Sequence, residues 1–335
     1  MSDLLNITNL KTHFFTKNGI IPAVDGISIS IPKSSIVGVV GESGCGKSMT
    51  AMSVMRLIQK PGKIVEGSIE LEGENLLLYS KEEMRSIRGD KISMIFQEPM
   101  TALNPVYTVG RQVTEAIRIH HPEISKKDAK TMALDIFNAV GIPEPEKRFK
   151  SYPHQLSGGL RQRVMIGMAM VCNPRLMIAD EPTTALDVTI EAQILYLMKK
   201  LQKERDTSIM LITHNLGVVA EICDYVYVMY AGKIMEQANT FELFKNTYHP
   251  YTYGLMKSIP KITEEKQRLY NIKGMVPNLM KLPKGCRFCP RCERALPKCF
   301  EQEPPLYKVD SGDEYSKEHY VRCFLHEDSE VIINE

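Results

Sequence analysis

The 335 residues of this chain are enough for one large domain and a smaller appendix. Apolar residues make up 43% of the chain and charged residues 24%, which is ordinary for soluble globular proteins and argues against disordered and fibrous classes. The formal net charge of +2 is far from the concentrated basic excess of a dedicated nucleic-acid binder.

The amino-terminal segment does not read as a targeting signal. Residues 1–15 alternate polar and apolar side chains instead of ordering a basic, an apolar and a small-residue region. No apolar run in the chain approaches the roughly 18 residues that a membrane-spanning helix needs. We therefore expect a cytoplasmic protein whose eight cysteines stay mostly reduced, and which reaches a membrane only through partner proteins.

A phosphate-binding loop is predicted between a strand and a helix. Residues 36–40 are an apolar, β-branched run typical of a buried strand, and apolar residues recur at helical spacing after Lys47. Between them, residues 41–48 fit the pattern G-x-x-x-x-G-K-[ST], in which backbone N–H groups wrap phosphates at the amino end of a helix. Lys47 is expected to reach the β and γ phosphates of ATP and Ser48 to bind Mg²⁺. The predicted nucleotide contacts are Gly41, Ser43, Gly44, Cys45, Gly46, Lys47 and Ser48.

A helical insert is predicted over residues 108–170, where helix formers and helical apolar spacing dominate. Within it, residues 156–163 read Leu-Ser-Gly-Gly-Leu-Arg-Gln-Arg and place a serine and two glycines at the start of an apolar helix. This arrangement predicts a second anion site at a helix amino end, with an ordinary serine N-cap as the structural alternative.

Two further apolar runs end in polar residues. Residues 176–179 predict a buried strand followed by Asp180 and Glu181, and residues 209–213 predict another, followed by His214. Asp180 is suited to hold the magnesium shell and Glu181 to orient and deprotonate an attacking water. Because polar residues at the carboxyl ends of parallel strands meet at one edge of a sheet, we expect one shared crevice.

The end of the chain differs in composition. Residues 225–230 predict a strand that enters a turn, and the α/β domain is expected to close soon afterwards. From about Tyr248 onward, prolines and five of the eight cysteines accumulate, which predicts a separate small module that does not continue the sheet. The dense thiols indicate an iron–sulfur or a zinc site, with no metal as the third alternative, and a cytosolic setting argues against disulfides.

The segment at residues 156–163 resembles the signature of ABC ATPases almost letter for letter. The resemblance implies an α/β fold, a P-loop NTPase of the ABC type with a helical subdomain at about 108–170. It also implies that Ser157, Gly158 and Gly159 face the γ-phosphate held by an opposite subunit, so that the chain works as a dimer. Matches in the family's order imply that Gln97 is the Q-loop glutamine, which touches Mg²⁺ or the water and relays the nucleotide state to the membrane subunits. They also imply a D-loop role across the dimer for Asp187, a γ-phosphate contact for the switch residue His214, and adenine stacking for Phe15 or its neighbour Phe14.

Over nearly its full length the chain resembles the D-type ATPases of dipeptide and oligopeptide importers, on residues 97–105, 152–155 and the carboxyl-terminal tail. This implies a nucleotide-binding domain at 1–255 and an extension at 256–335. Family members of this type use four tail cysteines, and some carry a [4Fe-4S] cluster on them. The matching residues here are Cys286, Cys292, Cys299 and Cys323. Cys289 departs from the pattern, either as a spare thiol or as a replacement for Cys286.

The resemblance implies a motor subunit that lies peripherally at the cytoplasmic face of the cell membrane. Its cofactors are ATP and Mg²⁺, and its implied partners are a homologous second ATPase subunit in a heterodimer, two transmembrane permeases and, indirectly, an extracytoplasmic solute-binding protein. Import of nickel or another small solute is the alternative within this class. A soluble ABC ATPase acting on nucleic acid or the ribosome is the alternative outside it, although no nucleic-acid partner is expected from the charge.

Overall fold

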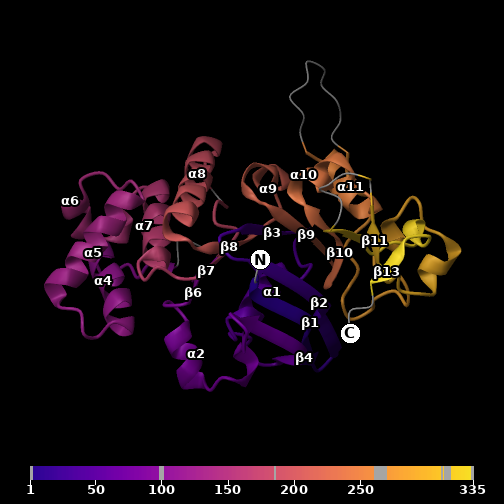
Figure 1. Cartoon of the computed structure of the whole chain (residues 1–335), viewed down its shortest axis with the longest axis horizontal. Helices are drawn as coiled ribbons and strands as arrows, with labels where there is room; N and C mark the ends of the chain where they lie inside the picture. Colours follow the sequence, from indigo (N-terminus) through magenta and orange to yellow (C-terminus); the bar gives the residue numbers. More distant parts are fainter. Residues whose placement is uncertain are drawn as a thin grey trace, which may run out of the picture. The chain divides into compact units, whose positions relative to one another are not determined.

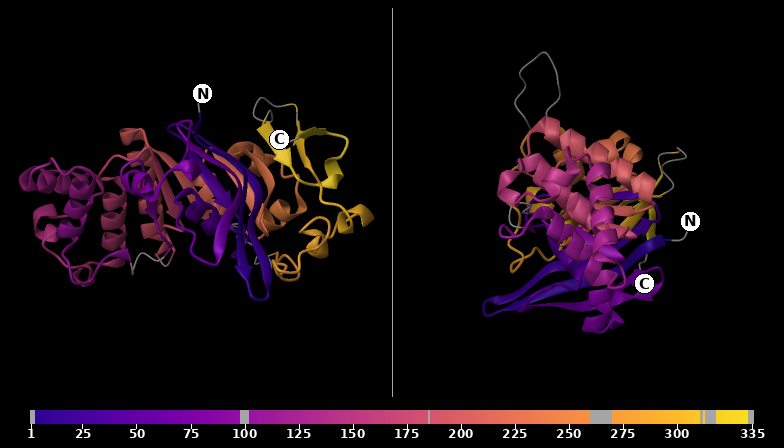
Figure 2. Two further views of the ribbon diagram at one scale, coloured as in Figure 1. Left: turned by 90° about the horizontal axis from the view of Figure 1, so that it is seen from below. Right: turned by 90° about the vertical axis from the view of Figure 1, so that its left-hand side faces the viewer.

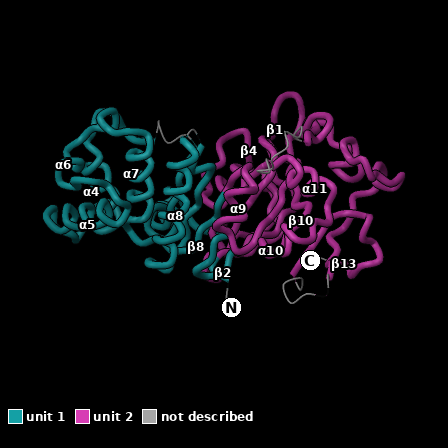
Figure 3. The backbone as a smooth tube through the Cα atoms, turned by 90° about the horizontal axis from the view of Figure 1, so that it is seen from above, with its two compact units in different colours: residues 1–4, 31–36, 78–211 teal, residues 5–30, 37–77, 212–335 magenta. Residues whose placement is uncertain are grey.

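The computed structural model describes most of the chain, which divides into two compact units (Figure 3). The first unit comprises residues 1–4, 31–36 and 78–211, and the second comprises residues 5–30, 37–77 and 212–335. The described residues are 3–97, 102–184, 186–259, 270–310, 312 and 318–332. Part of the predicted Q-loop segment, residues 98–101, and one D-loop residue, Ala185, lie outside them.

The first unit contains strands that are buried along almost their whole length. Strand β6 (Ile92–Ile95) pairs in parallel with β7 (Leu176–Asp180), and β8 (Ser208–Thr213) follows β7 in the sheet order. All residues of β7 and β8 are buried, as expected for central strands covered on both faces. The strands predicted at 176–179 and 209–213 are therefore confirmed.

Helices fill the region between β6 and β7. Helix α2 (Lys81–Ile87) precedes β6, and the helices after β6 are α4 (Val109–His120), α5 (Lys126–Ala139), α6 (Pro145–Phe149) and α7 (Gly158–Met170). Figures 1 and 2 show the last four as one magenta group. Thr108 and Ser125 cap α4 and α5 by accepting backbone hydrogen bonds, which satisfies N–H groups that a helix start leaves open. The longer helix α8 (Val188–Arg205) follows β7 in the chain.

The second unit contains a sheet in the order β13-β11-β12-β10-β9-β3. Strand β3 (Ile36–Val40) pairs in parallel with β9 (Tyr225–Tyr230), and β9 forms an antiparallel hairpin with β10 (Lys233–Asn239). Ala231 and Gly232, which join β9 to β10, both have positive φ angles, 45° and 86°, as the tight turns of right-twisted hairpins require. The predicted strands at 36–40 and 225–230 are confirmed.

A smaller antiparallel sheet and four helices complete this part of the chain. The sheet order is β2 (Gly19–Pro32), β1 (Asp3–Thr16), β4 (Gly62–Leu71) and β5 (Glu74–Asn75). The helices are α1 (Lys47–Val54), α9 (Leu216–Ile222), α10 (Thr240–Lys245) and α11 (Pro250–Lys257). Among the described residues, none of the helices combines the length and the apolar character needed to span a bilayer.

The carboxyl-terminal tail continues the sheet, so the prediction that it cannot do so is wrong. Strand β12 (His319–Val321) pairs with β10, β11 (Leu306–Val309) pairs with β12, and β13 (Glu330–Ile332) pairs with β11. Figure 1 shows β11 and β13 beyond β10. The prolines fall outside these strands, and strands of three or four residues are too short to show an alternating pattern. The edge of β10 supplies the backbone partners of β12, and each further strand pairs with the one before it in the sheet order.

Candidate functional site

The predicted phosphate loop lies between β3 and α1, and space as well as conformation requires glycine at Gly41 and Gly46. Gly41 and Gly46 have φ angles of 156° and 107°. A Cβ at Gly41 would lie 2.0 Å from the carbonyl oxygen of Met229, and one at Gly46 would lie 2.2 Å from that of Ala23. At Gly44, by contrast, no atom lies within 4 Å of an added Cβ. The loop thus packs closely against the backbone of Met229 and Ala23, whereas it is open at Gly44.

Lys47 lies at the start of α1 with its ammonium turned back over the loop. Its Nζ donates hydrogen bonds to the carbonyl oxygens of Gly41, at 2.7 Å, and of Glu42, at 3.0 Å, and the residue is only 5% exposed. Ser43 and Gly44 are exposed, whereas the Cys45 side chain is buried and its pKa is raised by that burial. A fixed cation and the amino end of a helix therefore converge on an open loop, which suits a bound phosphate.

The carboxylates at the end of β7 lie in different surroundings. Asp180 is buried, while Glu181 is half-buried and has a φ angle of 48°, which is uncommon for a residue other than glycine. The Glu181 Oε2 atom accepts hydrogen bonds from Gln97 Nε2 and from Thr184 Oγ1, both at 3.1 Å. The first unit thus brings Gln97 and Glu181 together. Thr184 was not singled out from the sequence, although its position three residues after Glu181 is the signal that could have found it.

The glycine-rich segment before α7 is accessible. Ser157 is the N-cap of α7, its Oγ accepts a hydrogen bond from the Leu160 N–H at 3.4 Å, and both Ser157 and Gly158 are exposed. Ser157 therefore acts as an ordinary N-cap, and the exposed amino end of α7 remains available to an anion. Gln162, buried in α7, donates from Nε2 to the carbonyl oxygen of Pro182 at 2.5 Å, a tie between the signature helix and the segment after Glu181 that sequence reasoning missed.

The remaining predicted contacts of the nucleotide lie at the surface. His214 follows β8 and is exposed, and the exposed Asp187 is the N-cap of α8 without a side-chain cap bond. Phe15, on β1, is 43% exposed, and the Lys63 ammonium lies 5.8 Å from the centre of its ring. These side chains are accessible to a ligand or to a second protein chain.

Comparison with known proteins identifies the family. Residues 24–184 match the model of the ABC transporter family, and residues 235–299 match the model of the oligopeptide/dipeptide transporter C-terminal region. The chain is 52% identical over 329 residues to the oligopeptide transport ATP-binding protein AppD of Bacillus subtilis, with 98% of both chains covered. This chain belongs to the ABC transporter family. The dipeptide transport ATP-binding protein DppD of Escherichia coli is 45% identical over 317 residues, which cover 95% of this chain and 96% of DppD.

Solved structures agree with this assignment. A dimeric post-hydrolysis state of the ATP-binding cassette MJ0796, bound to ADP and Pi, has a TM-score of 0.63 at 26% identity and covers 70% of this chain and 98% of its own. CbiO1 from Clostridium perfringens, part of the ABC transporter complex CbiONQ, has a TM-score of 0.64 at 25% identity, with 73% and 92% covered. The chain is an ABC-type ATPase with the P-loop NTPase fold.

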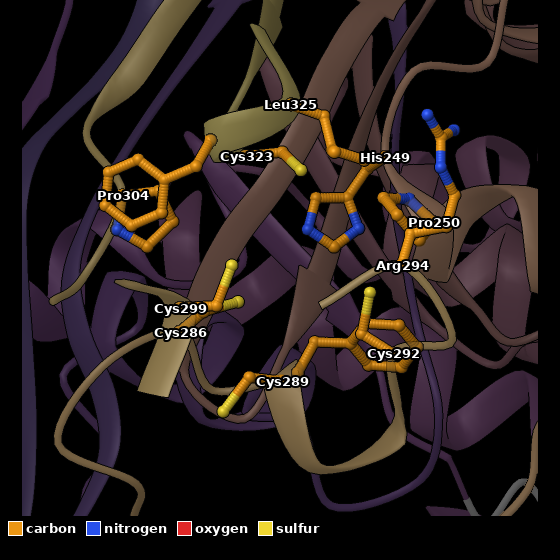
Figure 4. Close-up of a pocket in the computed structure, with 12 residues that line it drawn as sticks. His249, Pro250, Cys286, Cys289, Cys292, Arg294, Cys299, Pro304, Cys323 and Leu325 are labelled. Atoms are coloured by element: carbon orange, nitrogen blue, oxygen red, sulfur yellow. The ribbon is translucent and has the colours of Figure 1, made fainter. Parts of the chain in front are cut away.

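The five tail cysteines of this ABC ATPase line one pocket (Figure 4). They are Cys286, Cys289, Cys292, Cys299 and Cys323. Burial, reinforced by the neighbouring thiols, raises the pKa of Cys286 to about 12 and that of Cys323 to about 11. Among the described residues, however, no group of three or more His, Cys, Asp or Glu side chains is placed to hold a metal ion. The predicted ligands therefore share a pocket, but they do not form a ready-made ion site.

His249 reaches the same pocket from the start of α11 (Figure 4). The residue is 1% exposed, and its Nδ1 accepts a hydrogen bond from the Tyr251 N–H at 3.0 Å. Burial lowers the pKa of His249 to about 4, so the ring is neutral at physiological pH and carries its proton on Nε2. This Nε2 atom is buried and has no hydrogen-bond partner in the described part of the chain. His249 thus brings a buried ring to the lining of a pocket that also holds five cysteines.

Proposed function

We propose that this ABC ATPase hydrolyses MgATP to drive uptake of oligopeptides or dipeptides by an importer of the cell membrane. The observation that carries the proposal is similarity over nearly the full chain to ATP-binding proteins of oligopeptide and dipeptide transport. The match of residues 235–299 to the C-terminal region of such transporters supports it independently of the ATP site. The subunit would lie peripherally at the cytoplasmic face of the membrane.

The proposed division of labour in ATP hydrolysis follows from the chemistry of each side chain. Lys47 neutralises the β and γ phosphates, while Ser48 and Asp180 hold Mg²⁺. Glu181 orients and deprotonates the attacking water, and Gln97, which already contacts Glu181, positions that carboxylate with respect to the magnesium shell. His214 contacts the γ-phosphate, and the exposed Phe15 stacks on adenine.

A second ATPase subunit completes the proposed mechanism. The start of α7, where Ser157 and Gly158 are exposed and Gly159 is half-buried, would bind the γ-phosphate held by that subunit, with Asp187 at the same interface. ATP would then close the pair, and hydrolysis would reopen it and bias two permease subunits between inward and outward states. The partner is proposed to be a homologous chain, and the solute is proposed to arrive from an extracytoplasmic binding protein.

The cysteine pocket is proposed to hold a [4Fe-4S] cluster on Cys286, Cys292, Cys299 and Cys323. These four cysteines would hold the cluster as thiolates, the ligand type that iron–sulfur clusters use. The unpartnered Nε2 of His249 suits this group, because cluster sulfurs accept hydrogen bonds. When bound, the cluster would cross-link the segments that carry the cysteines and offer a one-electron couple.

Iron and sulfide analysis of the anaerobically purified full chain tests this site. We expect about four irons per chain in the wild type, and loss of both iron and sulfide when any of the four proposed ligands is changed to alanine. Cys289→Ala and the control Cys223→Ala, which removes a buried thiol outside the pocket, should keep the cluster. Stoichiometric zinc without sulfide would contradict the cluster, and loss of iron in Cys289→Ala would make Cys289 a ligand.

Uptake in cells that lack this chain tests the transport role. We expect uptake of labelled oligopeptides or dipeptides to fall to background, and to return with the wild-type chain but not with Lys47→Ala, because transport needs the bound nucleotide. Nickel uptake, measured in the same cells, should be unchanged. Normal peptide uptake together with loss of nickel uptake would contradict the peptide assignment while leaving the ATPase intact.

A further inference from the structure

An arginine of the cysteine-rich tail, Arg291, forms a salt bridge with Glu42 of the phosphate loop. Arg291 Nη1 lies 2.6 Å from Glu42 Oε2, and Arg291 Nη2 lies 3.0 Å from Glu42 Oε1. This is the bidentate geometry in which a guanidinium binds a carboxylate most strongly. The Arg291 side chain is 6% exposed and that of Glu42 is 24% exposed, so solvent screens the pair only in part. Both residues belong to the second compact unit.

Residues of the tail and of β9 hold the Arg291 guanidinium in place. Its Nε donates to the Lys273 carbonyl oxygen at 3.0 Å, and its Nη1 donates to the Tyr230 hydroxyl at 3.3 Å. The Phe288 ring packs edge-on against Tyr230, with ring centres 5.3 Å apart. Arg291 is also the last residue of the 3₁₀ turn Cys289–Arg291 and directly precedes Cys292. The residue that binds Glu42 therefore lies in the same short segment as two cysteines that line the pocket.

Glu42 is the second residue of the loop, and its carboxylate, its backbone N–H and its carbonyl oxygen all form hydrogen bonds. Its carboxylate binds Arg291, its backbone N–H donates to the Tyr251 hydroxyl at 2.8 Å, and its carbonyl oxygen accepts from Lys47 Nζ. Tyr251 lies in α11, so two of these three contacts come from beyond β10. A shift of the Glu42 peptide would therefore move the Lys47 ammonium and the backbone N–H groups that face the phosphates.

The charge of Glu42 matters as much as its position. A carboxylate in a loop that receives a polyanion repels the ligand unless a cation neutralises it. Arg291 supplies that cation through a rigid fork, which a flexible lysine ammonium does not reproduce. The ion pair therefore has two effects on the loop: it fixes the position of the Glu42 peptide, and it neutralises the charge of the Glu42 carboxylate.

We propose that Arg291 is a positioning residue for the phosphate loop, through which the carboxyl-terminal cysteine region sets the ATP affinity of this subunit. The inference rests on the assignment of residues 41–48 as the nucleotide loop. It does not depend on which metal, if any, the pocket binds, because the contacts are made by protein atoms alone. Arg291 acts through Glu42, so the expected effect is on ATP binding and not on the chemical step.

The test is ATP affinity of the full chain, measured as the Kd for a non-hydrolysable ATP analogue with Mg²⁺ and as KM and kcat in the assembled transporter. Arg291→Met should raise Kd and KM on the order of 10-fold, within the usual range of coupling between sites, with kcat nearly unchanged. Arg291→Lys should raise them by a smaller factor. Adding Glu42→Gln to Arg291→Met should lower KM again, because the unpaired carboxylate is gone.

The matched control is Lys298→Met, which breaks an ion pair with Glu327 inside the same tail instead of the ion pair with Glu42. Its KM should match the wild type. A wild-type KM in Arg291→Met, or an equal rise in Lys298→Met, would show that Arg291 only stabilises the tail and would overturn the inference. If Arg291→Met does not fold, Arg291→Lys carries the test, and a wild-type KM in that variant would contradict it. Lys47→Ala separates the two claims, since unchanged ATP binding there would refute the loop assignment itself.

Discussion

Glu181→Gln is expected to reduce ATP hydrolysis by roughly 10²–10⁴-fold, the usual contribution of a general base. An amide has nearly the shape of the carboxylate but does not take a proton from water. The substitution replaces the carboxylate that accepts hydrogen bonds from Gln97 and Thr184 with an amide of similar size, so it leaves no cavity. ATP binding should persist, since the phosphate loop is untouched, and a closed ATP-bound pair with the second subunit should accumulate.

Phosphate release measures the first effect, and size-exclusion chromatography with ATP and the partner subunit measures the second. Glu146→Gln, which makes the same change on the exposed surface of α6, is the matched control and should behave as the wild type. Wild-type turnover in Glu181→Gln would remove Glu181 from the role of base.

Lys47→Ala is expected to weaken ATP binding by about 10- to 150-fold. The variant loses a hydrogen-bonding cation whose contact with a charged group contributes about 1.5–3 kcal/mol, which is one to two powers of ten in affinity. In the structure this ammonium is held by the carbonyl oxygens of Gly41 and Glu42, so it is already placed over the loop. Hydrolysis should fall at least as far, because the same cation neutralises the transferred phosphate.

Isothermal titration of MgATP into the full chain checks this prediction. Lys81→Ala removes an exposed lysine at the start of α2 and is the matched control for loss of one positive charge. An unchanged Kd in Lys47→Ala, with a normal melting temperature, would place the nucleotide elsewhere in the molecule.

The local elements of the ATP site could be predicted because each depends on neighbouring residues. The loop at residues 41–48 needs glycines where φ is positive and where a side chain would strike backbone, and those requirements show directly in the sequence. Strands β3, β7 and β8 each contain a continuous apolar run of four or five residues, so their existence follows from local composition. The Ser157 cap likewise follows from one residue at the start of an apolar helix.

The tail was predicted less well because its structure depends on distant partners. Strands β11 and β12 have four and three residues, too few to reveal a period, and β12 becomes a strand by pairing with β10. The thiol-rich composition indicated that cysteines gather, and five of them do line one pocket. The unpartnered Nε2 of His249, a residue that lines this pocket, was not visible in the sequence.

The sequence by itself determined the nucleotide chemistry of this protein, since a phosphate loop, a carboxylate strand end and a signature helix are encoded in short runs of adjacent residues. Only the tertiary structure decided how the tail bears on that chemistry. Arg291 and Glu42 are 249 positions apart, and nothing in either local sequence marks them as partners. Such a contact exists only once strand pairing and aromatic packing have closed the long intervening chain and offset the entropy of doing so.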